Sequence, residues 1–452
     1  MTRLFGTNGI RGVVGRDMTA DLAVGIGKAI GTFFGRGTVA LARDTRLSGP
    51  MLARAAASGL MAVGCDVVDL GAVPTPAAQF HVKSHLGLRG AVVITASHNP
   101  REFNGIKAID GLGMEMRRED EEAIESIYFE GRFAPAAWSD VGSIRSDDSA
   151  VNRYLAGILS QVDVEAIRKR AFTVVVDPGN GAGCSATPYL LTALGCRVVT
   201  LNGQGDGAFP GRPPEPAEEH LGDLLRIVPE ARADLGVAHD GDADRAIFVD
   251  ENGAFLHGDK SFALLAGAAL AKRGGLVVTP VSTSSLLDDV VRQAGGKVHR
   301  TRVGAPIVAR AMFEMGAAFG GEENGGVLFP SHQFCRDGAM AVAKMLELLA
   351  QKGRPLSELV AGLPRYHLRK ASVAVPLERR DSVLAAIERL VAGRKVETID
   401  GVKIHEPDGW VLVRPSGTEA IFRVYAEAKS AARAEALAKE GAGLVERALR
   451  GT

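Results

Sequence analysis

Hydrophobic and polar positions repeat one order of elements three times along the chain. Each copy has a short β-branched apolar run, a stretch with helical spacing of apolar residues, a glycine-bearing turn and a second apolar run. This order is typical of βαβ units whose sheets are largely buried. In the first copy a strand is expected at 39–42, a helix at 49–63 and a strand at 66–70. In the second copy a strand is expected at 173–176, a helix that ends near 194 and a strand at 196–199. In the third copy a strand is expected at 276–278, a helix at 284–294 and a strand at 297–299. We infer three related α/β domains.

The pattern changes after the basic, proline-containing segment 364–370. An α+β module is predicted there, with strands at 372–375, 409–414 and 421–426 and helices at 381–391 and 431–449. The polar stretch 142–149 and the turn 250–253 are interpreted as the other two boundaries. The predicted fold is therefore three similar α/β domains with mixed sheets plus a C-terminal α+β domain, at 1–149, 150–253, 254–366 and 367–452.

Composition supports several domains and argues against two classes of partner. The 452 residues exceed the size at which one hydrophobic core keeps growing. Formal net charge is +0, from 53 basic and 53 acidic residues, so no global charge favours nucleic acid or an anionic membrane. The longest apolar run, 262–271, is too short to span a bilayer. We expect no nucleic-acid or membrane partner.

Two further features predict a cytoplasmic location. Sequence with functional character begins at Leu4, which leaves no room for a signal peptide. The four cysteines form no Cys-x-x-Cys pair, so buried thiols in a reducing compartment are expected rather than zinc or redox sites.

Four short segments carry residues suited to chemistry. They are the serine loop (Thr95–Pro100), the aspartate loop (Asp240–Arg245), the glutamate loop (Gly321–Gly326) and the C-terminal loop (Arg414–Glu419). In that order they offer a hydroxyl nucleophile, three carboxylates, polar groups for sugar hydroxyls and donors for a phosphate. Their spread along the chain implies that several domains contribute to one cleft. Together they suit phosphoryl transfer on a phosphosugar.

The serine loop follows the apolar run 91–94, at the strand end where open α/β sheets place ligands. Ser97 is expected to be exposed there, with His98 or Lys107 to activate its hydroxyl. The alternative is a structural turn stabilised by Ser and Asn side chains, and from this motif alone that alternative is the favoured interpretation.

The aspartate loop places Asp240, Asp242 and Asp244 at alternate positions after the apolar run 235–238. Carboxylates this close repel one another unless a hard cation neutralises them, so Mg²⁺ is the expected occupant. A calcium-binding EF-hand loop fits poorly, because Arg245 occupies its glycine position and the flanks are strand-like. A haloacid-type phosphatase would need a different residue pattern after its nucleophilic aspartate. Metal binding is favoured over a solvated acidic turn.

The last two loops offer hydrogen-bonding groups. Glu322 and Asn324 stand among glycines and could bond the hydroxyls of a sugar ring. The C-terminal loop follows a strand and supplies guanidinium, hydroxyl and backbone N–H donors for phosphate oxygens, with Arg423 as a second guanidinium. A Ser-Gly turn at a strand end is the alternative for that loop.

These segments, with the opening Phe5–Gly12, resemble the α-D-phosphohexomutases over the whole chain. The resemblance implies four domains around a central cleft, and Ser97 carried as phosphoserine that completes the Mg²⁺ shell of the three aspartates. It implies acid–base or electrostatic roles for Arg11 and Lys107, and a place for Arg245 beside the metal. The distal phosphate would be bound by Arg414, Ser416, Gly417, Thr418 and Arg423.

In such enzymes a hexose 1,6-bisphosphate is both intermediate and activator. The Glu-Glu-Asn-Gly-Gly sequence at 322–326 looks like archaeal members described as phosphoglucosamine mutases. We therefore predict that glucosamine phosphate is the preferred substrate. The alternative is that the chain is a phosphomannomutase or phosphoglucomutase of the same family. A phosphatase and a non-catalytic phosphosugar sensor are the other two readings. Oligomeric state, monomer or homodimer, is left open.

Overall fold

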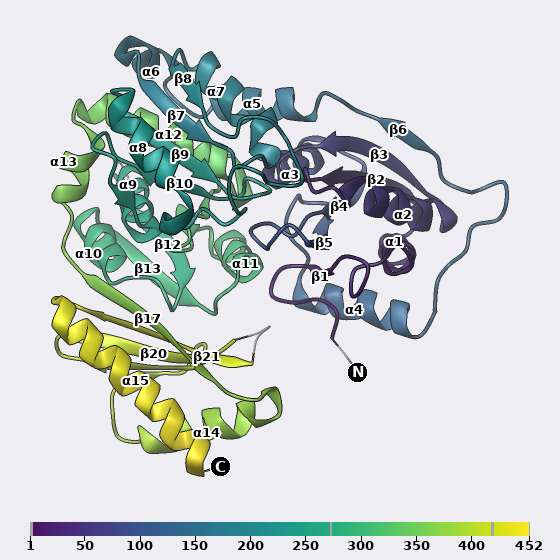
Figure 1. Ribbon diagram of the computed structural model, residues 1–452. Coiled ribbons are helices and arrows are strands. Elements are labelled where there is room, and N and C mark those ends of the chain that lie inside the picture. The colour runs from purple at the N-terminus through teal and green to yellow at the C-terminus, as the bar shows by residue number, and fades with distance from the viewer. Residues whose placement is uncertain (1–2, 272–273, 417–419, 452) are drawn as a thin grey trace.

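The computed structural model describes residues 3–271, 274–416 and 420–451, which form four sheets in chain order (Figure 1). Three mixed sheets with helices precede one antiparallel sheet, which confirms the predicted fold class. Over the described ranges, none of the helices combines the length and the apolar character that crossing a bilayer requires.

The first unit comprises β1 (Ile10–Val13), α1 (Ala20–Phe34), β2 (Gly37–Arg43), α2 (Gly49–Ala62), β3 (Cys65–Ala72), α3 (Thr75–Ser84), β4 (Leu88–Ile94), β5 (Phe103–Asp110), α4 (Arg118–Phe129) and β6 (Ile144–Ser146). Its strand order is β1-β5-β4-β2-β3-β6. Alternate residues of β2 belong to two different core clusters, because helices cover both faces of its parallel centre. The polar stretch interpreted as a boundary contains β6, which pairs with β3.

The second unit comprises α5 (Ala150–Leu159), α6 (Val164–Arg170), β7 (Thr173–Asp177), η1 (Ala182–Ser185), α7 (Thr187–Ala193), β8 (Arg197–Thr200), η2 (Glu218–His220), α8 (Gly222–Glu230), β9 (Leu235–His239), β10 (Ala246–Val249) and β11 (Phe255–Leu256). The order β11-β10-β9-β7-β8 contains the predicted parallel pair β7 and β8. The turn at 250–254 closes a hairpin between β10 and β11, so this sheet runs past the predicted boundary at 253.

The third unit comprises α9 (Gly258–Leu270), β12 (Gly275–Pro280), α10 (Leu286–Gln293), β13 (Gly296–Thr301), α11 (Ala305–Met315), β14 (Phe319–Gly321), β15 (Val327–Phe329), β16 (Gln333–Arg336), α12 (Gly338–Lys352) and α13 (Leu356–Ala361), with strand order β13-β12-β14-β15-β16. Helix α12 is mostly buried and packs against α5, α6 and α7 of the second unit. A single core cluster therefore runs through the first three units.

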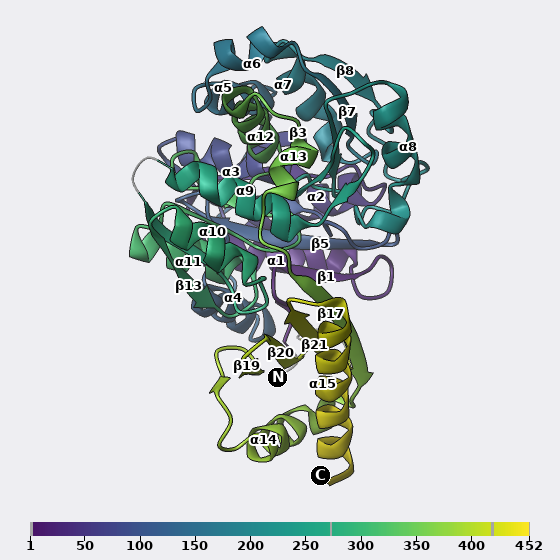
Figure 2. The same cartoon turned by 90° about the vertical axis from the view of Figure 1, so that its left-hand side faces the viewer.

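The fourth unit comprises β17 (His367–Ala374), η3 (Leu377–Arg379), α14 (Arg380–Leu390), β18 (Val396–Glu397), β19 (Val402–Glu406), β20 (Gly409–Pro415), β21 (Ile421–Ala428) and α15 (Ala431–Gly451). Helices α14 and α15 cover one face of its sheet (Figure 2). Alternation along β20 places Val411 and Val413 in that core, while Trp410 and Leu412 pack on Val281 of the third unit. The fourth unit therefore has its own core and a small contact with its neighbour.

Candidate active site

The serine loop follows β4, at the carboxyl end of a parallel strand. Ser97 has a φ of 51°, and its hydroxyl donates a 2.7 Å hydrogen bond to Oδ2 of Asp240. The prediction that Ser97 is exposed is wrong, because the residue is 0% exposed. The aspartate loop packs directly over it: a Cβ at Gly241 would lie 2.6 Å from the Ser97 carbonyl oxygen, so glycine is required. A left-handed non-glycine residue is strained, which is common at functional sites.

A buried guanidinium that the sequence reasoning missed holds the serine loop in place. Arg46 donates hydrogen bonds of 2.6–2.8 Å to four carbonyl oxygens, those of Ser97, Asn99, Pro100 and Phe103. Its Nε donates to Asp44, whose carboxylate also accepts a 2.6 Å bond from the Thr95 hydroxyl. The available signal was Asp44-Thr45-Arg46 directly after β2, because neighbouring parallel strands end at the same sheet edge.

The three predicted metal ligands lie together between β9 and β10. Asp240, Asp242 and Asp244 are buried, and one ligand atom from each lies within 4.8 Å of the others. Among the described residues, Oδ1 of Asp242 and Oδ1 of Asp244 have no hydrogen-bond partner. Burial and the two neighbouring carboxylates raise the pKa of Asp240 well above its usual value. Buried carboxylate oxygens without partners are costly, and a hard dication would satisfy them, so this site fits a metal such as Mg²⁺.

Cationic side chains surround these carboxylates. Nζ of Lys107, on β5, lies 2.8 Å from Asp242 Oδ2 and 3.5 Å from Asp244 Oδ2. Burial lowers the pKa of Lys107, but the two carboxylates outweigh it and the net shift is upward, so the ammonium is charged. Nε of Arg245 lies 3.8 Å from Asp240 and 3.9 Å from Asp244. The structure therefore places both predicted cations beside the predicted metal ligands.

Arg11 and His98 lie next to the serine loop. Nη1 of Arg11 donates a 2.6 Å hydrogen bond to Oδ1 of Asn99. Nδ1 of His98 lies 2.9 Å from Nη2 of Arg245 and 3.4 Å from the Ser97 hydroxyl. The charge of Arg245, with burial, holds the pKa of His98 far below its usual value, so the imidazole is neutral. All five predicted catalytic residues are thus gathered at one place, and their individual roles stay predictions.

The glutamate loop is joined to the aspartate loop by an arginine that the sequence reasoning missed. Arg336, at the end of β16, is buried and pairs with Glu322 at 3.1 Å and with Asp244 at 2.5 Å. Burial raises the pKa of Glu322, although Arg336 opposes the shift. No local motif marked Arg336, since its partners come from two other segments.

The other polar residues of the glutamate loop have different surroundings. Oδ1 of Asn324 accepts a 3.1 Å hydrogen bond from the backbone N–H of Gly326, which shapes the turn. Glu323 is half-buried and accepts a 3.3 Å bond from the Ser282 hydroxyl. Within the ranges described, Glu323 forms no ion pair, so its carboxylate is available to a cationic ligand group. Sugar recognition by Glu322 and Asn324 stays a prediction.

The C-terminal loop lies in the fourth unit, beside the third. Nη2 of Arg414 lies 3.0 Å from Oδ2 of Asp400, which also accepts a 3.0 Å bond from the N–H of Val303. Arg423 is opposite Arg414 in the ladder of β20 and β21. The carbonyl oxygen of Ser416 accepts a bond from Arg380. The predicted ligands Gly417 and Thr418 lie outside the described residues.

Family models of phosphoglucomutase/phosphomannomutase match all four units. The α/β/α domain models I, II and III match residues 2–135, 152–253 and 257–366, and the C-terminal domain model matches residues 373–444. These matches cover most of the chain in the order of the four sheets.

Whole proteins of this family are similar over their full length. The chain is 48% identical to a phosphoglucomutase/phosphomannomutase of Thermococcus kodakarensis, covering 100% of both. It is 45% identical to a probable phosphoglucosamine mutase of Methanopyrus kandleri, covering 99% of this chain and 98% of that one. A crystal structure of a phosphoglucomutase/phosphomannomutase family protein from Burkholderia thailandensis superposes with a TM-score of 0.89 at 31% identity, covering 98% and 97%. The chain therefore belongs to the phosphoglucomutase/phosphomannomutase family of α-D-phosphohexomutases and is an isomerase, as its four motifs indicate.

Proposed function

We propose that the chain interconverts hexose 6-phosphate and hexose 1-phosphate through phosphorylated Ser97 and a hexose 1,6-bisphosphate. The observation that carries this proposal is the hydroxyl of Ser97, buried 2.7 Å from Asp240 and beside two carboxylates with unpartnered oxygens. A hydroxyl held among metal-binding carboxylates suits a phosphoryl carrier, since charge on the transferring group is then neutralised where it develops.

In the first half-reaction a sugar hydroxyl attacks the phosphorus on Ser97. The bond between phosphorus and the Ser97 oxygen breaks, and the proton lost by the sugar hydroxyl balances the one gained by the serine oxygen. The bisphosphate then reorients and returns its other phosphoryl group to Ser97. A bound Mg²⁺, held by Asp240, Asp242 and Asp244, would neutralise charge on the phosphoryl group. Lys107 and Arg245 add positive charge at the same point.

We further propose glucosamine phosphate as the preferred substrate. Glu322 is engaged by Arg336, whereas the Glu323 carboxylate is half-buried and available. An ammonium group at C2 of the sugar would gain from that charge, whereas a hydroxyl would gain less. Two of the similar proteins differ on this point, one being named for glucose and mannose phosphates and the other for glucosamine phosphate. Mannose and glucose phosphates are therefore the alternative substrates.

The reaction class is tested with hexose 1-phosphate labelled on its phosphate, with bisphosphate and Mg²⁺ present. A mutase transfers the label by way of Ser97 to C6 of a further sugar molecule, whereas a phosphatase releases it as inorganic phosphate. A non-catalytic binding protein leaves the 1-phosphate unchanged. Wild-type protein should give the first result, and Ser97→Ala should give the third. Release of inorganic phosphate as the main product would contradict the proposal.

The substrate is tested by comparing kcat/KM for the 1-phosphates of glucosamine, glucose and mannose under one set of conditions. Glucosamine 1-phosphate should be used most efficiently, and Glu323→Gln should narrow its advantage while Asn324→Ala lowers all three efficiencies. A tenfold advantage for glucose or mannose phosphate, about 1.4 kcal/mol in transition-state binding, would reject the preference and leave the mutase proposal in place.

A further inference from the structure

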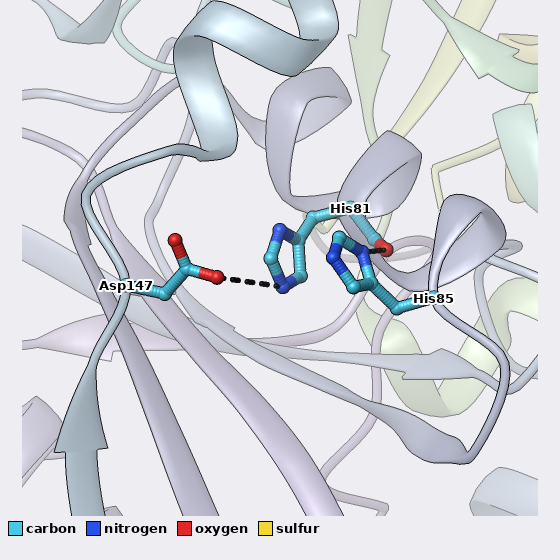
Figure 3. Close-up of side chains that lie close together, drawn as sticks. All are labelled: His81, His85 and Asp147. Carbon is cyan, nitrogen blue, oxygen red and sulfur yellow. Dashed lines mark hydrogen bonds and ion pairs between the residues drawn. The ribbon is translucent and has the colours of Figure 1, made fainter.

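A second group of side chains of the types that ligate metals lies at the joint between the first and second units (Figure 3). It consists of His81 and His85 at the C-terminal end of α3, and Asp147, which follows β6. The i, i+4 spacing places both histidines on one face of the helix, where their rings stack with centroids 4.0 Å apart. One ligand atom from each residue lies within 4.8 Å of the others.

Two of these side chains are already held in a state suited to metal binding. Nδ1 of His85 lies 2.7 Å from the carbonyl oxygen of His81 and donates to it, which leaves the lone pair on Nε2. Figure 3 shows that Nε2 on the side facing His81. Oδ1 of Asp147 accepts bonds from the N–H and the hydroxyl of Ser149, which fixes the carboxylate and leaves Oδ2 facing His81.

The imidazole of His81 is the unexplained group. It is 2% exposed, and Nδ1 has no hydrogen-bond partner in the part of the chain that the structure describes. Nε2 lies 3.9 Å from Oδ2 of Asp147, which is too far for a hydrogen bond. Burial is the main cause that lowers the pKa of His81 to about 4, although Asp147 opposes the shift, so the ring is neutral at pH 7. Nε2 of His81 and Oδ2 of Asp147 face each other without a hydrogen bond between them, and a cation placed between these two atoms would give both of them a partner.

We propose that His81, His85 and Asp147 bind a transition-metal dication, of which Zn²⁺ is the representative, through both Nε2 atoms and the carboxylate. Imidazole suits Zn²⁺, Co²⁺ and Ni²⁺, whereas Mg²⁺ prefers oxygen ligands, so this site and the aspartate loop select different ions. Metal–nitrogen bonds of about 2.0–2.1 Å require the ligands to close by roughly an ångström. His85 is half-buried at a helix end and has room for that movement.

The proposed ion would bind the first unit to the segment that leads into the second. His81 and His85 belong to α3, and Asp147 lies three residues before α5, which packs against α3. A bound ion at this joint would stabilise the folded arrangement of the two units, because the unfolded chain does not hold the three ligands together.

The test is a Co²⁺ titration followed by absorbance and by equilibrium dialysis, in excess Mg²⁺ and in an Asp242→Asn background that weakens the aspartate site. The His85→Ala variant is compared with His299→Ala, in which a half-buried histidine outside both sites is removed. The Asp242→Asn parent and its His299→Ala variant should each bind one equivalent of Co²⁺ more than the His85→Ala variant. The unfolding midpoints of the first two proteins should rise when Co²⁺ or Zn²⁺ is added. Asp147→Asn should lose the same equivalent, which guards against a folding defect in one variant. Equal Co²⁺ stoichiometry in the parent and His85→Ala would reject the site and leave a bound water as the partner of His81.

Discussion

Replacing Arg46 with lysine separates the positioning of Ser97 from its chemistry. The change keeps the positive charge beside Asp44 but removes the planar set of donors. In the structure the guanidinium makes four bonds to carbonyl oxygens of the serine loop and the strand after it, and one to Asp44. Lysine has three donors, so at least two of these bonds are lost.

The expected magnitude follows from those two bonds. A hydrogen bond to a charged group contributes about 1.5–3 kcal/mol, so the closed serine loop should lose roughly 3–6 kcal/mol. A folded domain is stable by about 5–15 kcal/mol, so Arg46→Lys can still fold. A loop that opens moves Ser97 away from Asp240, and a shift of about 3 kcal/mol toward the open form predicts a fall in kcat of up to roughly a hundredfold.

The assay measures kcat and KM with hexose 1-phosphate and bisphosphate, alongside urea unfolding. Arg54→Lys is the matched control, because Arg54 is exposed on α2 and bonds only within its own helix among the described contacts. Arg46→Lys should lower kcat with little change in KM, while Arg54→Lys should behave as the wild type. A loss of stability with wild-type kcat would show that Arg46 supports the fold alone and would refute the positioning role.

Four further outcomes are expected. Ser97→Ala should abolish turnover while the circular dichroism spectrum of the folded protein stays unchanged; wild-type-like turnover would exclude the phosphoserine route. Asp242→Asn should weaken Mg²⁺ binding in calorimetry, with partial rescue of activity at high Mg²⁺, and an unaltered affinity would remove this residue from the metal site. Arg414→Ala should raise KM roughly ten- to hundredfold, since a charge-assisted bond is worth about 1.5–3 kcal/mol; unchanged kinetics would place the phosphate elsewhere. Burial and the charge of Glu323 raise the pKa of Asp259 to about 7. The folded state therefore keeps a proton that the unfolded state loses, and the free energy of unfolding falls as pH rises from about 4 through 7. Asp259→Asn should remove that loss, which is at most about 4 kcal/mol. If the urea unfolding midpoint changes equally between pH 5 and pH 8 in the wild type and in Asp259→Asn, the reasoning is contradicted.

Local pattern located the elements that were predicted, although many other helices and strands of the structure were not predicted. The helix expected at 49–63 is α2 (Gly49–Ala62), and the runs at 173–176 and 276–278 lie in β7 and β12. These predictions are correct because the spacing of apolar residues along the chain indicates which face of a helix or strand is buried. The antiparallel strands β1 and β5 were not predicted, since their pairing joins segments about ninety residues apart.

Some features of the candidate site could likewise be predicted from the sequence, and others depend on the tertiary structure. The types and order of the chemical residues determined the family, because each motif is contiguous in the chain. The burial of Ser97 and the contacts of Arg46 and Arg336 depend on how separate loops pack, over separations of 143 residues between Ser97 and Asp240 and 92 between Arg336 and Asp244. The proximity of His81 and Asp147 has the same origin, since His81 lies on α3 and Asp147 lies in the segment that follows β6. Sequence spacing encodes which face of an element is apolar, but only tertiary packing decides which charged groups share a buried volume and which of them lack a partner.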